Sequence, residues 1–367
     1  MNSSLYIHVP FCKRLCGYCD FYKTMSLSRK EEYLRAAAAE MEQRQNELSG
    51  TTLQTVYLGG GTPSVLSTDE IGSLIGAAGR VWEFSGVEEL TVEANPDDLK
   101  PDYLAALLQT GCNRLSIGIQ SFRDDDLQMM NRRHNATEAV EAVENARRAG
   151  FDNISIDLIY GLPTMTLDEW RTNIATAIDL GVEHISAYHL TIEPQTLFAR
   201  RGIKPIDERL SEEEYLLLHE QLTAHGYEHY EISNFALNGR RSRHNSGYWS
   251  SRPYLGIGPG AHSYDGARRR SWNPPSLDSY LDHSAAEFEE LSDGELKEEY
   301  IMVRLRTSEG IDLSAFESRF GAKAEAELRN RAERFLADGT LNLSDGALAF
   351  NPRRWLVSDN VIEELFD

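Results

Sequence analysis

Cysteine, positive charge and long apolar runs are all scarce in this sequence. Four cysteines in 367 residues, three of them close together, do not provide a disulfide framework, because an odd group leaves one thiol unpaired. No stretch approaches the roughly 20 apolar residues that cross a bilayer. The first residues, MNSSLYIHVPF, have neither the basic start nor the cleavage site of a signal peptide. These absences predict a soluble protein of a reducing compartment, the cytoplasm.

The shortage of positive charge also bears on the partners of the protein. The 37 Lys and Arg residues face 58 Asp and Glu residues, which gives a formal net charge of −21 at pH 7. That excess argues against a nucleic-acid footprint over the whole surface, and we expect no nucleic-acid partner. The arginines gather at Arg240, Arg241 and Arg243 and at residues 268–270. Such runs are usually solvated loop faces, although one could meet an anionic ligand or partner.

The three clustered cysteines, Cys12, Cys16 and Cys19, have a C-x3-C-x2-C spacing. Tetrahedral zinc would need a fourth ligand nearby, and the available His8 lies on a predicted strand before the loop. A [4Fe–4S] cluster fits better and leaves one iron without a protein ligand. The amino and carboxylate groups of S-adenosylmethionine (SAM) suit that open iron. A zinc site and packed thiols remain the alternatives, and Cys112 is most simply a buried small hydrophobe.

Strand and helix patterns alternate through the first 235 residues. Short segments rich in β-branched and apolar residues predict buried parallel strands, separated by amphipathic helices. We expect strands at 4–9, 55–58, 89–93, 114–120, 153–159 and 184–190, and helices at 29–48, 68–82, 101–109, 137–148 and 167–180. Thr68 and Asp168 stand where N-caps are expected. Six such units form either an open doubly wound sheet or a partial barrel.

The residues that follow these strands favour the barrel. Enzymes built on βα barrels place their sites at the carboxyl ends of the strands. Here the first strand runs into the cysteine loop, the second into residues 59–63 (GGGTP), and the third ends at Glu93. Asp157 stands in the fifth strand, and Glu193 follows the sixth. Each feature alone is an ordinary turn or cap, but together they indicate one site around the cysteines.

Several segments resemble the anaerobic coproporphyrinogen III oxidase group of radical SAM proteins. They include YIHVPFCKRLCGYCDFY, YLGGGTPS, VEANPDD, GCNRLSIGIQSF and ISIDLIYGLP, and the resemblance extends over essentially the whole chain. It implies a partial (β/α)6 radical SAM barrel, with a [4Fe–4S] cluster held by Cys12, Cys16 and Cys19. It also implies that SAM is bound by Tyr6, Gly60, Gly61, Thr62 and Glu93, with Gln120, Arg132 and Asp157 at further cofactor positions.

Two departures from the oxidase separate this chain from it. The oxidase motif continues to a fourth cysteine, where this sequence has Phe21, and only five residues precede Tyr6. Residues 244–249 (HNSGYW) match the H-N-x-x-Y-W motif of the HemW branch, whose members resemble heme chaperones. The resemblance therefore implies a heme chaperone without assigned catalytic residues. It would bind heme and deliver it to apoproteins, among them membrane-bound respiratory proteins. An oxygen-independent coproporphyrinogen III oxidase and a nucleic-acid-modifying radical SAM enzyme remain the alternatives.

The H-N-x-x-Y-W segment has two interpretations. His244 could ligate heme iron through an imidazole nitrogen, with Tyr248 and Trp249 packed on the porphyrin and the nearby arginines on its propionates. Alternatively, His244 hydrogen-bonds the loop while the aromatic side chains fill the interdomain core. His262 is a second candidate for the axial ligand.

The chain is longer than a single core usually fills, and its character changes near residue 238. We expect a radical SAM core at 1–237 and a C-terminal lid or partner domain at 238–367 that carries the heme-associated segment. Helices are expected at 287–305, 313–320, 322–338 and 359–366, with a hairpin at 340–350. This order is typical of a winged-helix-like α+β domain, but its acidic helices argue against DNA binding.

Overall fold

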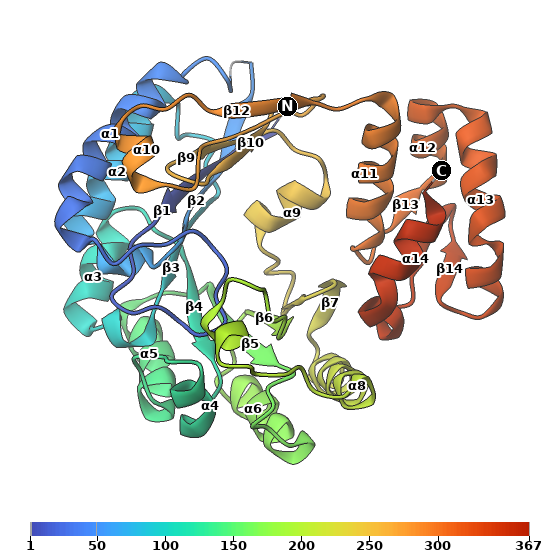
Figure 1. Cartoon of the computed structure of the whole chain (residues 1–367), viewed down its shortest axis with the longest axis horizontal. Helices are drawn as coiled ribbons and strands as arrows, with labels where there is room; N and C mark the ends of the chain where they lie inside the picture. The colour runs from blue at the N-terminus through green and yellow to red at the C-terminus, as the bar shows by residue number, and fades with distance from the viewer. Residues whose placement is uncertain (1, 49, 367) are drawn as a thin grey trace.

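The computed structural model describes residues 2–48 and 50–366, and its main feature is a curved 12-stranded sheet (Figure 1). The strand order is β12-β11-β10-β9-β1-β2-β3-β4-β5-β6-β8-β7, so the sheet has two ends and the barrel stays open. The six parallel strands of the barrel are β1 (Asn2–Val9), β2 (Thr52–Gly60), β3 (Glu89–Ala94), β4 (Arg114–Gln120), β5 (Ile154–Tyr160) and β6 (His184–His189), and a later strand also pairs in parallel with β1. The predicted partial (β/α)6 barrel is confirmed.

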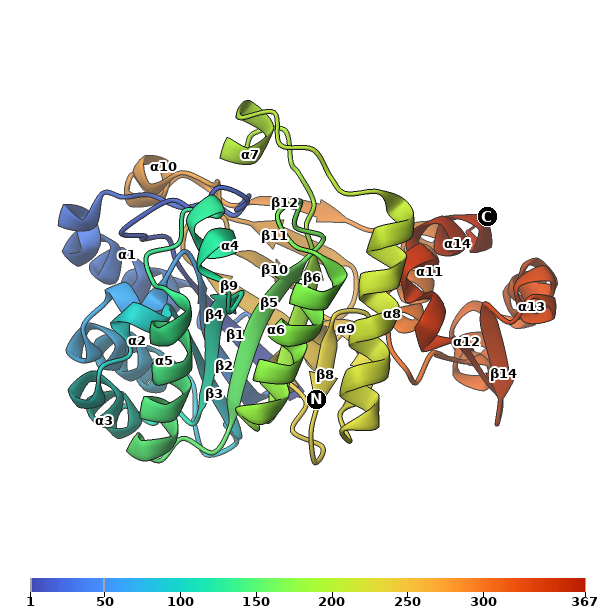
Figure 2. The ribbon, with the colours of Figure 1, turned by 90° about the horizontal axis from the view of Figure 1, so that it is seen from below.

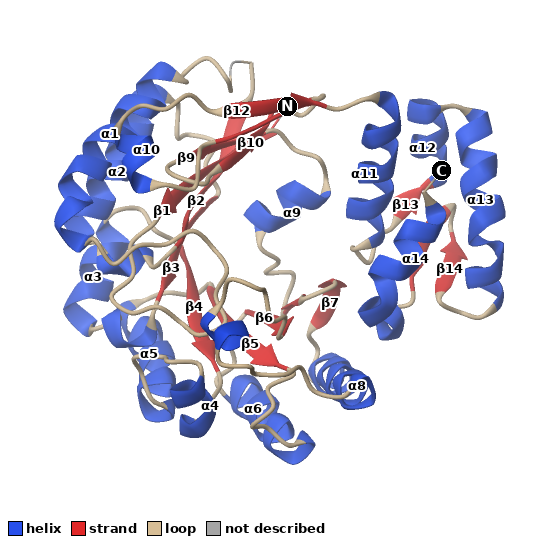
Figure 3. Ribbon diagram, in the orientation of Figure 1, coloured by secondary structure: helices blue, strands red, loops and turns tan. Residues whose placement is uncertain are grey.

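Helices cover the outer face of this sheet (Figures 2 and 3). They are α1 (Lys30–Gln43), α2 (Thr68–Val81), α3 (Pro101–Gln109), α5 (Ala136–Ala149), α6 (Leu167–Asp179) and α8 (Glu208–Ala224). Two short helices, α4 (Asp124–Met129) and α7 (Leu197–Arg200), lie in loops between these elements, and α7 lies beyond the strand ends (Figure 2). Because side chains alternate along a strand, Leu5, Ile7 and Val9 are fully buried under these helices while Tyr6 and His8 point into the barrel.

Two helices begin at the predicted residues, 68 and 167, but the predicted N-caps are wrong by one or two residues. The N-caps are Ser67 and Thr166, one residue before Thr68 and two before Asp168. Each hydroxyl accepts the backbone N–H three residues on, where Glu70 or Glu169 returns a hydrogen bond to the cap. This reciprocal capping box satisfies two helix-end donors at once, which a cap at Thr68 or Asp168 would not do. The first helix also ends at Gln43 rather than at residue 48.

After β6 the chain adds strands at both ends of the sheet. The hairpin β7 (Glu228–Glu231) and β8 (Asn234–Ala236) extends the β6 side, followed by helix α9 (Arg243–Trp249). The chain then crosses over, and β9 (Tyr254–Ile257) pairs in parallel with β1. β10 (His262–Tyr264), β11 (Arg269–Trp272) and β12 (Glu287–Glu290) continue the sheet antiparallel, with helix α10 (Leu277–Leu281) between the last two.

The helix predicted to begin at residue 287 is wrong in its first part. Residues Glu287–Glu290 are strand β12, paired with β11, and helix α11 begins at Asp293 behind the N-cap Ser292. Residues 254–290 thus share the sheet of the barrel, and the division at 237/238 stays a prediction.

A smaller α+β unit follows, at the right of Figure 1. Its helices are α11 (Asp293–Leu305), α12 (Leu313–Phe320), α13 (Ala322–Ala337) and α14 (Ser358–Leu365), and its sheet runs β13 (Ile311–Asp312), β15 (Ala347–Phe350), β14 (Leu341–Ser344). The helices-then-hairpin order matches the winged-helix-like prediction. Short 3-10 turns lie at Leu27–Arg29, Pro63–Val65, Pro96–Asp98 and Pro352–Val357. None of the helices in residues 2–48 and 50–366 is long and apolar enough to cross a membrane.

Candidate functional site

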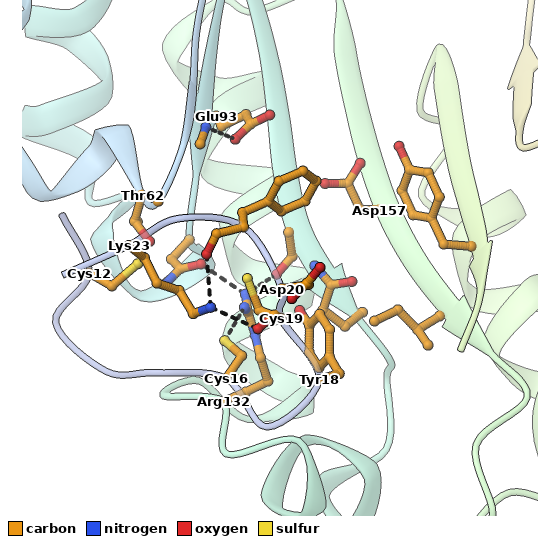
Figure 4. A pocket seen from close by; sticks show the side chains of 18 of the residues that line it. Cys12, Cys16, Tyr18, Cys19, Asp20, Lys23, Thr62, Glu93, Arg132 and Asp157 are labelled. Carbon is orange, nitrogen blue, oxygen red and sulfur yellow. Dashed lines mark hydrogen bonds between the residues drawn. The ribbon is translucent and has the colours of Figure 1, made fainter. Parts of the chain in front are cut away.

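A cavity of about 500 Å³ lies at the carboxyl ends of the parallel strands, beside the cysteine loop (Figure 4). Most of the residues singled out in the sequence line it: Cys12, Cys16, Cys19, Gly60, Gly61, Thr62, Glu93, Gln120, Arg132 and Asp157. Tyr6 and His244 do not belong to this lining. The structure therefore brings ten of the twelve predicted site residues to one cavity and places the other two behind its wall.

The cysteine loop is fixed at both of its ends and at its centre. Cys12 N donates to Thr24 O (2.9 Å) and Thr24 N to Pro10 O (2.7 Å), which closes the loop. Gly17 N donates to Met130 O (2.9 Å), and Phe198 N of α7 donates to Gly17 O (2.9 Å). These four hydrogen bonds fix the backbone of the loop and therefore the positions of its cysteine side chains.

The donor set of this loop fits an iron–sulfur cluster. All three thiols are free, and burial raises the pKa of Cys12 to about 11 and that of Cys19 above its usual range. No three His, Cys, Asp or Glu side chains among the described residues converge on one point, as ligands of a single metal ion do. A [4Fe–4S] cluster needs a different arrangement, because each thiolate binds a different iron. Three free thiols facing one cavity meet that need.

The glycine turn after β2 packs directly on the cysteine loop. Gly61 N donates to Val9 O (2.8 Å), and a Cβ on Gly61 would lie 2.8 Å from the carbonyl carbon of Pro10. Gly60 has a φ of +105°, and a Cβ there would lie 2.5 Å from the imidazole of His8. A side chain at Gly60 would push the turn away from β1, and one at Gly61 would push it away from the start of the loop, which explains why glycines stand here.

Two partly buried carboxylates lie on the inner wall of the cavity. Glu93 accepts from Tyr57 OH (2.8 Å) and from Gly60 N (3.1 Å), and burial raises its pKa to about 7. Asp157 accepts from Ser116 Oγ (3.3 Å), and burial raises its pKa to about 6. Both groups are poised to accept hydrogen bonds from a ligand that carries hydroxyl or ammonium groups.

Arg132 links the loop to the barrel. Its guanidinium donates to Cys16 Sγ (3.1 Å), to Asn95 Oδ1 (2.8 Å) and to the carbonyl of Gly118. The close-up shows this side chain beneath the loop, with a bond reaching the Cys16 sulfur (Figure 4). Arg132 thus fixes the position of the Cys16 sulfur relative to the barrel.

Helix α9, which carries the H-N-x-x-Y-W motif, lies on the inner side of the sheet (Figure 1). His244 is only 1% exposed. Its Nδ1 lies 2.8 Å from Thr55 Oγ1 on β2, and its Nε2 lies 2.9 Å from Tyr248 OH. Burial lowers its pKa to about 3, so the ring is neutral. Both ring nitrogens are therefore occupied, and iron ligation by His244 stays a prediction that requires α9 to move.

The arginines near α9 are also occupied, each by acidic side chains. Arg240 pairs with Asp152 (3.3 Å), Arg243 with Glu88 (2.5 Å), and Arg241 with both Glu228 and Glu309. His262, the second candidate ligand, is exposed on β10 and stacks on Trp272 at 5.9 Å between ring centroids.

Sequence reasoning missed several residues that complete the site. Tyr18 and Lys23 of the cysteine loop line the cavity with Asn95, Ser116, Gly118 and Tyr188. Tyr57 lies behind the wall, where it holds Glu93. A usable signal existed for Tyr57, because strand alternation places it on the same inward face as Gly59, two residues later.

Comparison with known proteins shows which family the chain resembles. The Radical SAM superfamily profile matches residues 6–177, and the HemN C-terminal domain profile matches residues 291–357. The heme chaperone HemW of Bacillus subtilis is 36% identical over 372 residues, which covers 98% of this chain and 97% of that protein. The mitochondrial radical S-adenosyl methionine domain-containing protein 1 of Bos taurus is 35% identical over 328 residues, with 84% and 74% covered.

Among solved structures, coproporphyrinogen III oxidase (HemN) from Escherichia coli superposes with a TM-score of 0.86 at 23% identity, covering 99% of this chain and 90% of that one. At that identity the likeness shows the fold alone. The HemW proteins, by contrast, match nearly end to end at more than a third identity. The chain belongs to the HemW family of radical SAM proteins.

Proposed function

We propose that this protein is a heme chaperone of the cytoplasm that carries a [4Fe–4S] cluster and SAM, binds heme and delivers it to apoproteins. The observation that carries the proposal is the 36% identity to the heme chaperone HemW of Bacillus subtilis over 98% of the chain. The proposed recipients are heme proteins, including membrane-bound respiratory proteins.

In this proposal the cavity holds the cluster and SAM. Cys12, Cys16 and Cys19 would hold the cluster, and the amino and carboxylate groups of SAM would chelate its open iron. Gly60, Gly61 and Thr62 give backbone and hydroxyl contacts to SAM, and Glu93 accepts from its ribose. Gln120, Arg132 and Asp157 complete the lining, and Tyr6 supports the wall from behind, with its hydroxyl 3.2 Å from His8 Nδ1.

Heme binding is assigned to the α9 segment, with His244 as iron ligand once the helix has moved and His262 as the alternative. The region from 238 to 367 then serves as a lid and as the surface that meets the recipient protein.

The second candidate is an oxygen-independent coproporphyrinogen III oxidase, favoured by the fold shared with HemN. Phe21 weighs against it. This side chain replaces the fourth cysteine of the oxidase motif and is 71% exposed at the rim of the cavity.

One preparation tests both candidates. Protein reconstituted with iron and sulfide under anaerobic conditions is titrated with hemin and, in parallel, incubated with coproporphyrinogen III, SAM and a reductant. The chaperone gives a shifted Soret band and leaves the porphyrinogen unconverted. Steady formation of protoporphyrinogen with release of carbon dioxide would overturn the proposal and restore the oxidase.

A further inference from the structure

Helix α9 is held against the inside of the barrel at its first turn. The Glu89 carboxylate, at the start of β3, accepts the backbone N–H groups of Arg243 (2.9 Å) and His244 (3.0 Å). Glu89 is itself 2% exposed. This buried anchor directs the His244 side chain across the barrel interior to β2, where Thr55 meets its Nδ1.

The His244 ring packs on Tyr57, the residue that holds Glu93. The two ring centroids are 4.9 Å apart, with 30° between the ring planes. Tyr6, on the neighbouring strand, lies 6.3 Å from His244 and 6.1 Å from Tyr57, so the three rings form one aromatic layer inside the barrel. In a packed interior, moving one of these rings leaves the others without support.

From Tyr57 the contacts continue to the cavity without a break. Tyr57 OH donates to Glu93 Oε1 (2.8 Å), and Gly60 N donates to Glu93 Oε2 (3.1 Å). Gly60 and Glu93 both line the cavity. A continuous path of direct contacts therefore runs from α9 through Tyr57 and Glu93 to the glycine turn.

We propose that helix α9, held in place through His244, supports the wall of the SAM site from behind. His244 is then a positioning residue that holds Tyr57, and through it Glu93, in the arrangement that binds SAM. It follows that SAM binding and iron ligation by His244 oppose each other, a consequence that rests on the proposed heme function.

The opposition has a simple structural cause. An iron needs the lone pair of one imidazole nitrogen, and here Thr55 and Tyr248 occupy both in a buried setting. Ligation must break one of these hydrogen bonds and withdraw the ring from Tyr57. SAM bound over Glu93 favours the position of α9 in which His244 packs on Tyr57. Heme favours a position in which His244 has left Tyr57 and is free to bind iron. By linkage, each ligand weakens the other by the same factor.

The first test measures SAM binding in the absence of heme. Anaerobic calorimetry on the reconstituted protein compares the wild type with His244→Ala, Tyr57→Phe and the double variant. We expect Tyr57→Phe to weaken SAM binding about tenfold, the effect of losing its hydrogen bond to the Glu93 carboxylate. His244→Ala should weaken SAM binding by up to the same factor, because it removes the ring that packs on Tyr57 and acts only through that bond. The double variant should lose much less than the product of the two, because both changes act on one path.

The chain offers a matched control in His184. This histidine is also buried, between a Ser155 hydroxyl at 2.7 Å and the Tyr230 hydroxyl at 2.8 Å. His184→Ala should lower the melting temperature as His244→Ala does, yet leave SAM affinity at the wild-type value. Equal SAM affinity in His244→Ala and the wild type, or equal weakening in both histidine variants, would overturn the proposal. If His244→Ala does not fold, Thr55→Val replaces it. Thr55→Val removes the hydrogen-bond partner of His244 Nδ1 and keeps the imidazole ring. The same outcomes for SAM affinity then decide the proposal.

The second test titrates hemin into the holoprotein with and without saturating SAM, and SAM with and without hemin. We expect the two affinities to fall by equal factors, and His244→Ala to lose the coordinated Soret band. A band that His244→Ala loses but SAM leaves unchanged would contradict the opposition. A wild type that binds no heme would refute the proposed function, while the SAM measurements would still decide the role of α9.

Discussion

Sequence motifs point to two regions, the cavity beside the cysteine loop and helix α9. The two regions differ in how accessible their functional groups are to a ligand. The cavity is open, and its three thiols and two carboxylates face space of about 500 Å³. In α9 the histidine is 1% exposed, and both its nitrogens are hydrogen-bonded. The cavity is accessible to a ligand as it stands, whereas the α9 region must open first. A motif thus identifies chemistry, and the packing around it decides when that chemistry is available.

The largest effect is expected when one of the proposed cluster ligands is removed from the cavity. Cys16→Ala should abolish the cluster, because two thiolates cannot hold it. Iron and sulfide analysis and the visible charge-transfer band measure the loss. Cys112→Ala is the control, since Cys112 is 2% exposed in the hydrophobic core and outside the cavity, and it should keep full cluster content. Full cluster content in Cys16→Ala would show that the cavity is not the cluster site.

The next largest effect is expected at the carboxylate that joins the two regions. Glu93→Ala removes the acceptor of Tyr57 OH and Gly60 N, and should weaken SAM binding about 10- to 100-fold. Anaerobic titration calorimetry gives the value. Glu31→Ala, an exposed glutamate on α1 paired only loosely with Arg35 (3.7 Å), is the matched control and should bind SAM normally. Unchanged affinity in Glu93→Ala would remove Glu93 from the site.

The glycine turn provides a sharper test of how rigidly the open site is built. Gly60→Ala places a Cβ at a φ of +105° and 2.5 Å from His8. We expect a loss of about 1–3 kcal/mol in the free energy of unfolding, measured by denaturant titration. Gly79→Ala, on α2 with open space around it, should be neutral or slightly stabilising. Equal stability of the two variants would show that the turn is not held against β1.

The smallest expected effect is a pH dependence of stability. Burial raises the folded pKa of Glu93 to about 7, whereas its unfolded pKa is about 4.3. Between these values the folded state binds more protons than the unfolded state, so this stabilisation is present below about pH 4.3 and is lost as pH rises toward 7. Chemical unfolding from pH 5 to 8 should show a decline that is shallower in Glu93→Gln. Identical slopes would mean that Glu93 titrates normally.

The sequence predicted the open site better than the closed one for a physical reason. Strands such as Arg114–Gln120 and the helix Pro101–Gln109 follow from local periodicity, and parallel strands bring their carboxyl ends together. The position of the His244 ring depends on a hydrogen bond to Thr55, which lies 189 positions earlier in the chain. No local sequence pattern predicts such a distant partner. The same limit explains strand β12, whose EFEE segment becomes a strand only because β11 lies beside it.

The most direct test of the central claim is a measurement of heme transfer. Holoprotein loaded with hemin is mixed with an apo b-type cytochrome, and the growth of the cytochrome Soret band is compared with the loss of heme to a passive scavenger. A chaperone predicts transfer faster than spontaneous dissociation, with a rate that rises with acceptor concentration. Transfer at the scavenger rate, independent of the acceptor, would contradict the account.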